Sequence, residues 1–196
     1  MQFDSNSTSY DNAPAGPHVA RLISIIDLGT QEGSYEGKPT QRRQNLFVWE
    51  IPDELREDGK PHTIGKFYTQ SVNEKSNLGK DLTSWLGKAP VPPKTAEESV
   101  KFTNDVIKPL LGKGCQIVVI ENADTGKVKV SSVIGLPKGT TLPKESAYPY
   151  VFFDLDAYDE EVFDNLTEWQ KNTIMKSPEF AKIMSGDSEE EPEIPF

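Results

Sequence analysis

Aromatic and basic side chains alternate along two stretches of the chain that have β-strand character. One face of the predicted strand 42–51 carries a cation, an amide and two rings: Arg43, Asn45, Phe47 and Trp49. In the predicted strand 62–72, Lys66, Tyr68 and Gln70 share one face. Rings stack on unpaired bases, worth about 1–3 kcal/mol per base, while cations hold the phosphates. This pattern predicts a surface that binds single-stranded nucleic acid.

The same alternation allows the opposite orientation. Phe47 and Trp49 would then belong to the core, with Leu46 and Val48 outside. Tyr68, which has Lys66 beside it on the same face, is the position where we most expect base stacking.

Lysines are concentrated around these strands. Residues 60–113 contain nine lysines and five acidic residues. Lys75 and Lys80 bracket the start of a predicted helix, where unpaired backbone N–H groups also favour a phosphate. We expect both to contact the nucleic-acid backbone; the alternative is an ordinary solubilised helix surface.

The elements that must position these residues follow a recognisable order. Strands are predicted at 18–28, 42–51 and 62–72, with a loop at 29–40; helices at 77–87 and from the capping box Thr95–Glu98 to about 111; and strands at 115–121 and 127–134. Three strands, a helical connection and two strands match the OB-fold, a five-stranded Greek-key barrel. The expected fold class is therefore mainly β with helices.

Beyond residue 136 the sequence predicts a looser region. Prolines punctuate a linker, an edge strand is possible at 150–155, and short helices are expected at 167–176 and 177–184. The expected domains are an N-terminal arm (1–17), the OB-fold domain (18–136), a linker with a helical extension (137–184) and an acidic tail (185–196).

Charge is unevenly distributed along the 196 residues, whose net charge is -10. Residues 1–150 hold 18 basic and 18 acidic residues, whereas residues 151–196 hold 3 basic and 13 acidic residues. An acidic total therefore does not exclude an anionic partner for the body.

Several classes of protein are disfavoured. No apolar stretch is long enough to span a membrane, and the first residues lack the pattern of a secretory signal. A single cysteine, Cys115, fits a reducing cytoplasm, and two histidines with one cysteine argue against structural zinc.

Enzyme signatures are missing from the sequence. Phosphate-binding loops, nucleophile elbows and HExxH motifs do not occur. We expect no catalytic residues, no cofactor and no metal. A metal-dependent nuclease built on scattered acids ranks last: Asp27, Glu50, Asp81 and Glu121.

The end of the chain predicts a docking peptide. An acidic run from Asp187 leads into Glu193, Ile194, Pro195 and Phe196. Prolines keep such a segment extended, so that its terminal ring can enter an apolar pocket while the carboxylate meets a cation.

This ending resembles the C-terminal tip of bacterial single-stranded-DNA-binding proteins. The body resembles single-stranded-DNA-binding proteins of tailed phages over roughly residues 3–136, through PAGPHVAR (14–21), IIDLGTQ (25–31) and YTQSVNEKSNL (68–78). The resemblance implies an OB-fold that coats single strands during replication, recombination or repair in the bacterial cytoplasm. It also implies that Ile194, Pro195 and Phe196 recruit replication and repair proteins.

We therefore expect a non-enzymatic protein that binds single-stranded DNA with little sequence preference, as a monomer or dimer. The alternative is an acidic adaptor or DNA mimic that binds proteins rather than DNA.

Overall fold

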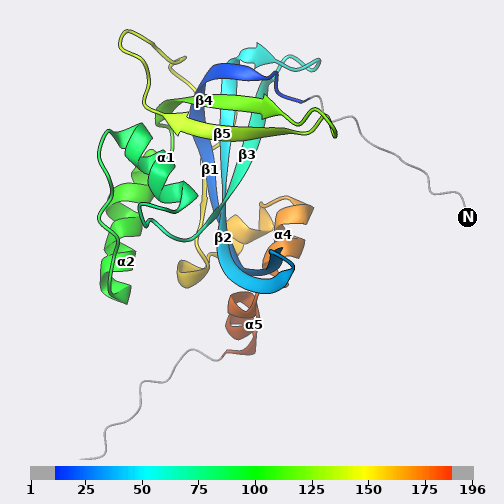
Figure 1. Cartoon of the computed structure of the whole chain (residues 1–196). Helices are drawn as coiled ribbons and strands as arrows, with labels where there is room; N and C mark the ends of the chain where they lie inside the picture. Colours follow the sequence, from blue (N-terminus) through cyan, green and yellow to red (C-terminus); the bar gives the residue numbers. More distant parts are fainter. Residues whose placement is uncertain (1–11, 187–196) are drawn as a thin grey trace, which may run out of the picture.

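The computed structural model describes residues 12–186, which form a mainly β structure with an open sheet and five α-helices (Figure 1). The strands are β1 (Gly16–Tyr35), β2 (Lys38–Leu55), β3 (Pro61–Thr69), β4 (Gly114–Glu121), β5 (Val128–Ile134) and β6 (Val151–Phe153). The helices are α1 (Asn77–Leu86), α2 (Ala96–Phe102), α3 (Glu160–Asp164), α4 (Glu168–Ile174) and α5 (Pro178–Ser185). The predicted mainly β class is confirmed, as is a helical connection between the third and fourth strands.

The sheet is not closed into a barrel. Its antiparallel order is β3-β2-β1-β4-β5, and β6 adds to β1 in parallel. No ladder joins β3 to β5 within residues 12–186. Instead, the ammonium group of Lys66 on β3 donates a hydrogen bond to the Ser131 carbonyl on β5, at 3.2 Å. A side chain, rather than a backbone ladder, connects the two ends of the sheet.

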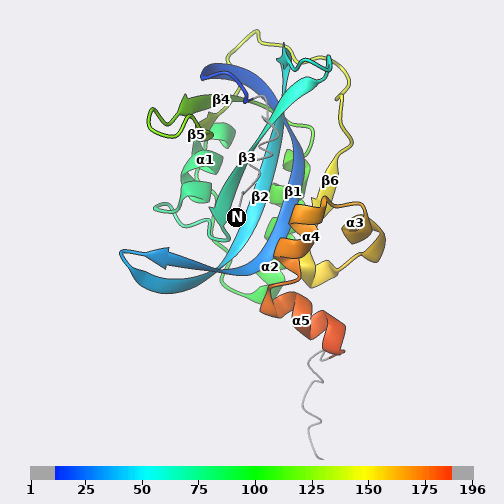
Figure 2. The same cartoon turned by 90° about the vertical axis from the view of Figure 1, so that its right-hand side faces the viewer.

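The predicted loop at 29–40 is wrong, because β1 and β2 continue as a long hairpin through this region (Figure 2). The strands stay paired as far as Tyr35 and Lys38. The two turn residues, Glu36 and Gly37, have φ of 51° and 75°. Two residues with positive φ make a hairpin turn whose twist matches the flanking strands, so the turn sustains strands of poor β propensity.

Helix α1 confirms the predicted boundaries. The Ser76 side chain caps its start by accepting from the Gly79 amide, and Gly87 ends it with φ 75°. Helix α2 begins at the predicted Thr95 cap, but Glu98 accepts from the Lys94 amide at 2.7 Å. A π-helical segment (η1, Thr103–Ile107) and a 3₁₀ turn containing Pro109 (η2, Lys108–Leu110) then complete the connection.

Two apolar cores lie on opposite faces of the sheet. The first fills the curved inner face beneath α1 and includes Leu22, Trp49, Leu82 and Ile117. The second lies between the β1–β2 hairpin and the C-terminal helices: Ile26, Leu28, Leu46, Phe153, Leu155, Phe163, Leu166, Ile174 and Phe180. Figure 2 shows α4 beside the β1–β2 strands, with α5 below them.

The predicted linker and helical extension are bound to the body. Glu50 on β2 accepts from the Ser146 hydroxyl at 2.8 Å and the Ala147 amide at 3.1 Å. The Tyr148 hydroxyl donates to the Pro61 carbonyl at 2.6 Å. The predicted edge strand and both predicted C-terminal helices are present as β6, α4 and α5.

Candidate nucleic-acid interface

The three rings expected to stack on bases lie inside the molecule. Phe47, Trp49 and Tyr68 are 1%, 0% and 2% exposed. Phe47 packs edge-on against Tyr68, with 5.1 Å between ring centroids. The stacking role predicted for these rings is therefore wrong, since a base cannot reach them. The face of β2 and β3 that we expected to be exposed to solvent is the concave face of the curved sheet, and its side chains form part of the first core.

Lys66 is occupied by a buried polar network rather than offered to solvent. Its ammonium donates to Asp81 Oδ2 on α1 at 2.6 Å, and the Tyr68 hydroxyl donates to the same oxygen at 2.7 Å. The Val133 amide on β5 donates to Asp81 Oδ1 at 3.4 Å. Burial raises the pKa of Tyr68 above its ordinary range, and the Asp81 charge adds to the shift. The hydroxyl thus remains a donor that helps to join β3, α1 and β5.

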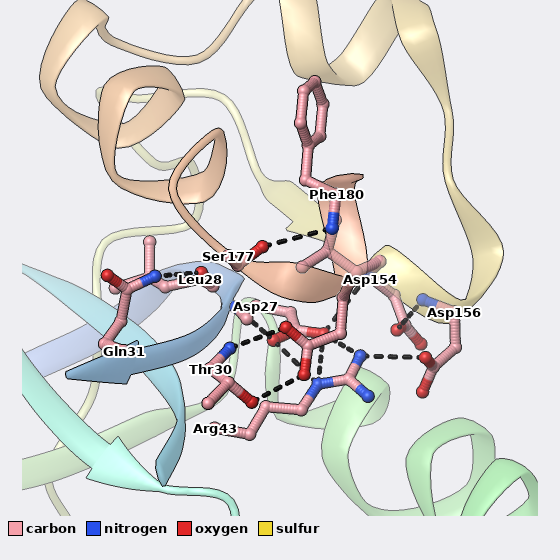
Figure 3. Close-up of polar contacts among 12 residues, drawn as sticks. Asp27, Leu28, Thr30, Gln31, Arg43, Asp154, Asp156, Ser177 and Phe180 are labelled. Atoms are coloured by element: carbon pink, nitrogen blue, oxygen red, sulfur yellow. Dashed lines mark hydrogen bonds and ion pairs between the residues drawn. The ribbon is translucent and has the colours of Figure 1, made fainter. Parts of the chain in front are cut away.

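Arg43 has acidic partners as well (Figure 3). Its guanidinium donates to both carboxylate oxygens of Asp27 on β1 and pairs with Asp156 at 2.9 Å. Burial alone would lower the pKa of Arg43, but these two carboxylates outweigh it and raise the pKa. Arg43 therefore joins the hairpin to the segment after β6, and the predicted phosphate contact competes with two ion pairs.

A second contact in Figure 3 fastens α5 to the hairpin. The carboxylate of Glu179 accepts from the Thr30 amide at 2.8 Å and from its hydroxyl at 2.6 Å. Burial would raise the pKa of Glu179, but the bonds from Thr30 outweigh it and leave the pKa lowered. The ionised form of Glu179 is the one that holds α5 in place.

Lys75 and Lys80 are exposed, as a phosphate contact requires. Lys75 precedes the Ser76 cap, and its amide donates to Asn73 Oδ1 at 3.0 Å. Lys80 lies in the first turn of α1. Both stay predicted phosphate-binding residues.

An aromatic pair that the sequence did not predict is formed by a ring on the outer face of β3 and a ring on α4. Phe67 on β3 is 51% exposed, and Trp169 on α4 is 53% exposed. Their ring centroids are 5.9 Å apart at an interplanar angle of 66°. Two exposed rings in contact provide adjacent stacking surfaces for bases.

The surroundings of this Phe67–Trp169 pair suit a strand of nucleic acid. Gly65 and Thr69 lie on either side of Phe67 on the same face of β3, and both are exposed. Each is paired with a residue of the neighbouring strand β2. Gln44, which pairs with Thr69, shares the outer face of β2 with the exposed Arg42. The face combines rings, small polar groups and a cation.

No family model matches the chain, and no curated protein matches it significantly.

Two kinds of feature are not found among the described residues. Between residues 12 and 186 there is no group of three or more His, Cys, Asp or Glu side chains arranged to hold a metal ion. In the same range no helix combines the length and apolarity needed to cross a bilayer. The predicted docking residues Glu193, Ile194, Pro195 and Phe196 lie outside the described part of the chain.

Proposed function

We propose that this protein binds single-stranded DNA with little sequence preference, using the Phe67–Trp169 pair as its stacking surface. The exposed contact between these rings is the observation that carries the proposal. Every base has a face that can stack on an exposed aromatic ring, and two rings in contact enlarge the stacking surface. Lys75 and Lys80 supply phosphate contacts at the start of α1.

The strand order supports an OB-like architecture for this role. β1 pairs with both β2 and β4, and helices separate β3 from β4, as in that fold. OB-folds bind oligonucleotides on the outer face of their second and third strands. Phe67 occupies that face.

The wider role that we propose is to coat single strands during replication, recombination or repair, in the bacterial cytoplasm of a phage-infected cell. The C-terminal Glu193–Phe196 segment docks replication and repair proteins. Residues 1–150 have no net charge and are therefore compatible with binding a polyanion. The excess of acidic residues lies in residues 151–196.

Titration of fluorescein-labelled oligo(dT) at several salt concentrations tests the proposal. We expect binding that weakens as salt rises, since each phosphate contact contributes about −0.7 to the slope of log K against log salt. The double variant K75A/K80A should therefore reduce the slope by about 1.4. K138A/K144A removes the same charge from the segment between β5 and β6 and should leave the slope unchanged.

The same titration separates the proposal from its alternative, an acidic adaptor or DNA mimic. The alternative is favoured by the 13 acidic residues against 3 basic ones in residues 151–196. If neither the full chain nor a chain ending at Gly186 binds oligo(dT) at low salt, DNA binding is ruled out and the adaptor role remains.

Removal of residues 187–196 should tighten DNA binding at low salt. This segment holds five acidic residues and no basic one, so it competes with DNA for cations. We expect the gain in affinity to disappear at high salt, where charges are screened. Equal low-salt affinities with and without the segment would contradict the competition.

A further inference from the structure

A cavity of about 460 Å³ lies on the inner side of β2, opposite the face that carries Phe67. Its volume is typical of pockets for small ligands, about 300–1,000 Å³. Its walls come from β1, β2, the turn after β3, the α2–η1 segment and β6. The apolar part of the lining includes Ile25, Val72, Leu78, Phe102, Ile107 and Phe152. Two phenyl rings among these residues suit a flat ligand.

Two side-chain amides in the lining have no hydrogen-bond partner among the described residues. Asn45 on β2 is half-buried and Gln70, just after β3, is exposed; both line the cavity. Neither side chain makes a hydrogen bond within residues 12–186. Each amide offers two donors and an acceptor, the groups that pair with the edge of a nucleobase.

Charge decides which part of a nucleotide can enter. Asp27, Asp154 and Asp156 line the cavity with Arg43 as their cationic neighbour. Arg43 already pairs with Asp27 and Asp156. The surplus of carboxylates repels a phosphate, whereas a neutral base is not repelled.

The wall after β3 is held in place by close packing. Asn73 lies against Gly79 of α1, where an added Cβ would come within 2.1 Å of the Asn73 carbonyl oxygen. Ser76 Oγ lies 2.7 Å from both the Asn73 and the Ser71 carbonyl oxygens, which share its single hydroxyl proton. The cavity is therefore formed before a ligand arrives, which reduces the ordering cost of binding.

We propose that this cavity receives one unstacked base of the bound strand, whose edge pairs with the Asn45 and Gln70 amides. The inference rests on the proposed function and adds a second base-binding position to it. Chain order gives a path: β3 carries Phe67 on the outer face, Gln70 and Asn73 line the cavity, and Lys75 follows. The phosphates stay outside near Lys75 while one base turns inward, at the cost of its stacking.

Photocrosslinking tests this placement. Oligo(dT) with single 5-iodouracil substitutions crosslinks to aromatic side chains that touch the base, and peptide mass spectrometry locates the product. We expect crosslinks at Phe102 or Phe152 for some positions and at Phe67 or Trp169 for others. The double variant N45A/Q70A should lower the yield at Phe102 and Phe152 by about tenfold or more, since it removes two hydrogen-bonding amides. Q116A, which removes a half-buried amide on β4, should leave that yield unchanged.

The outcomes separate the cavity from the function. Oligonucleotide binding with crosslinks confined to Phe67 and Trp169 overturns the inference and leaves the proposed function standing. A cavity crosslink whose yield is the same in N45A/Q70A overturns the role of the amides. Absence of oligonucleotide binding by the full chain overturns the proposed function and the inference together. The crosslinks are mapped first on the unmodified protein, so the test of the cavity does not depend on whether the N45A/Q70A variant folds.

Discussion

The double variant F67A/W169A is expected to lower affinity for single-stranded DNA by at least about 30-fold, taking about 1 kcal/mol per ring as the lower limit. The two side chains are half exposed, so the free energy of unfolding should change by no more than about 1 kcal/mol per ring. Fluorescence polarisation of labelled oligo(dT) measures the affinity, and urea denaturation measures the stability.

Intrinsic fluorescence gives an independent check on this prediction. The other two tryptophans, Trp49 and Trp85, are 0% and 6% exposed, so Trp169 is the one that DNA can reach. We expect oligo(dT) to quench tryptophan emission, and W169F to abolish the quenching. Y150A, which removes a ring that is 50% exposed elsewhere, should bind normally. Full affinity in F67A/W169A would place the interface on another surface.

Asp81→Ala should destabilise the fold by about 3 kcal/mol, the lower end of the range for breaking a buried ion pair. The substitution leaves the Lys66 ammonium and the Tyr68 hydroxyl without their shared acceptor. The lower end applies because the Lys66 and Asp81 side chains keep 15% and 12% of their exposure. Loss of this carboxylate also removes one of the side-chain links between β3 and β5 and leaves only the Lys66 bond to the Ser131 carbonyl, since no ladder joins these strands within residues 12–186. Urea denaturation followed by circular dichroism measures the change.

A surface ion pair provides the matched control. Asp105 pairs with Lys101 at 3.2 Å, with both side chains more than half exposed. Asp105→Ala should change stability by less than about 0.5 kcal/mol, because exposed pairs contribute little. If Asp81→Ala were as mild as Asp105→Ala, the network would not hold the sheet ends together.

Local patterns in the sequence were enough to predict most elements. Capping residues such as Ser177 and Thr167, and the terminal Gly87, mark helix ends through hydrogen bonds made within a few residues. The hairpin turn at Glu36–Gly37 was missed because its strands are poor in β-branched residues and depend on pairing for their form.

The orientation of β2 could not be predicted from its alternation. Leu46 on the outer face is 6% exposed because the C-terminal helices cover it, so both faces of the strand carry apolar side chains. Periodicity distinguishes faces only when one of them meets water. The charges misled for a related reason: Asp27, one of the two acid partners of Arg43, is 16 residues away from it, and the acid partner of Lys66 is 15 residues away. Spacing in sequence gives no sign of such pairs.

The cover that α4 and α5 provide over the hairpin sets a limit on how this protein can be shortened. A fragment ending near residue 150 would lose β6 and these helices, and would bare a strip formed by Ile26, Leu28 and Leu46. It would also lack Trp169, half of the aromatic pair. Such a fragment should aggregate through this exposed apolar strip rather than serve as a minimal DNA-binding unit. It should do so even though residues 1–150 contain equal numbers of acidic and basic residues. Residues 151–186, whose composition alone suggests an appendage, are thus part of the folded body that they cover.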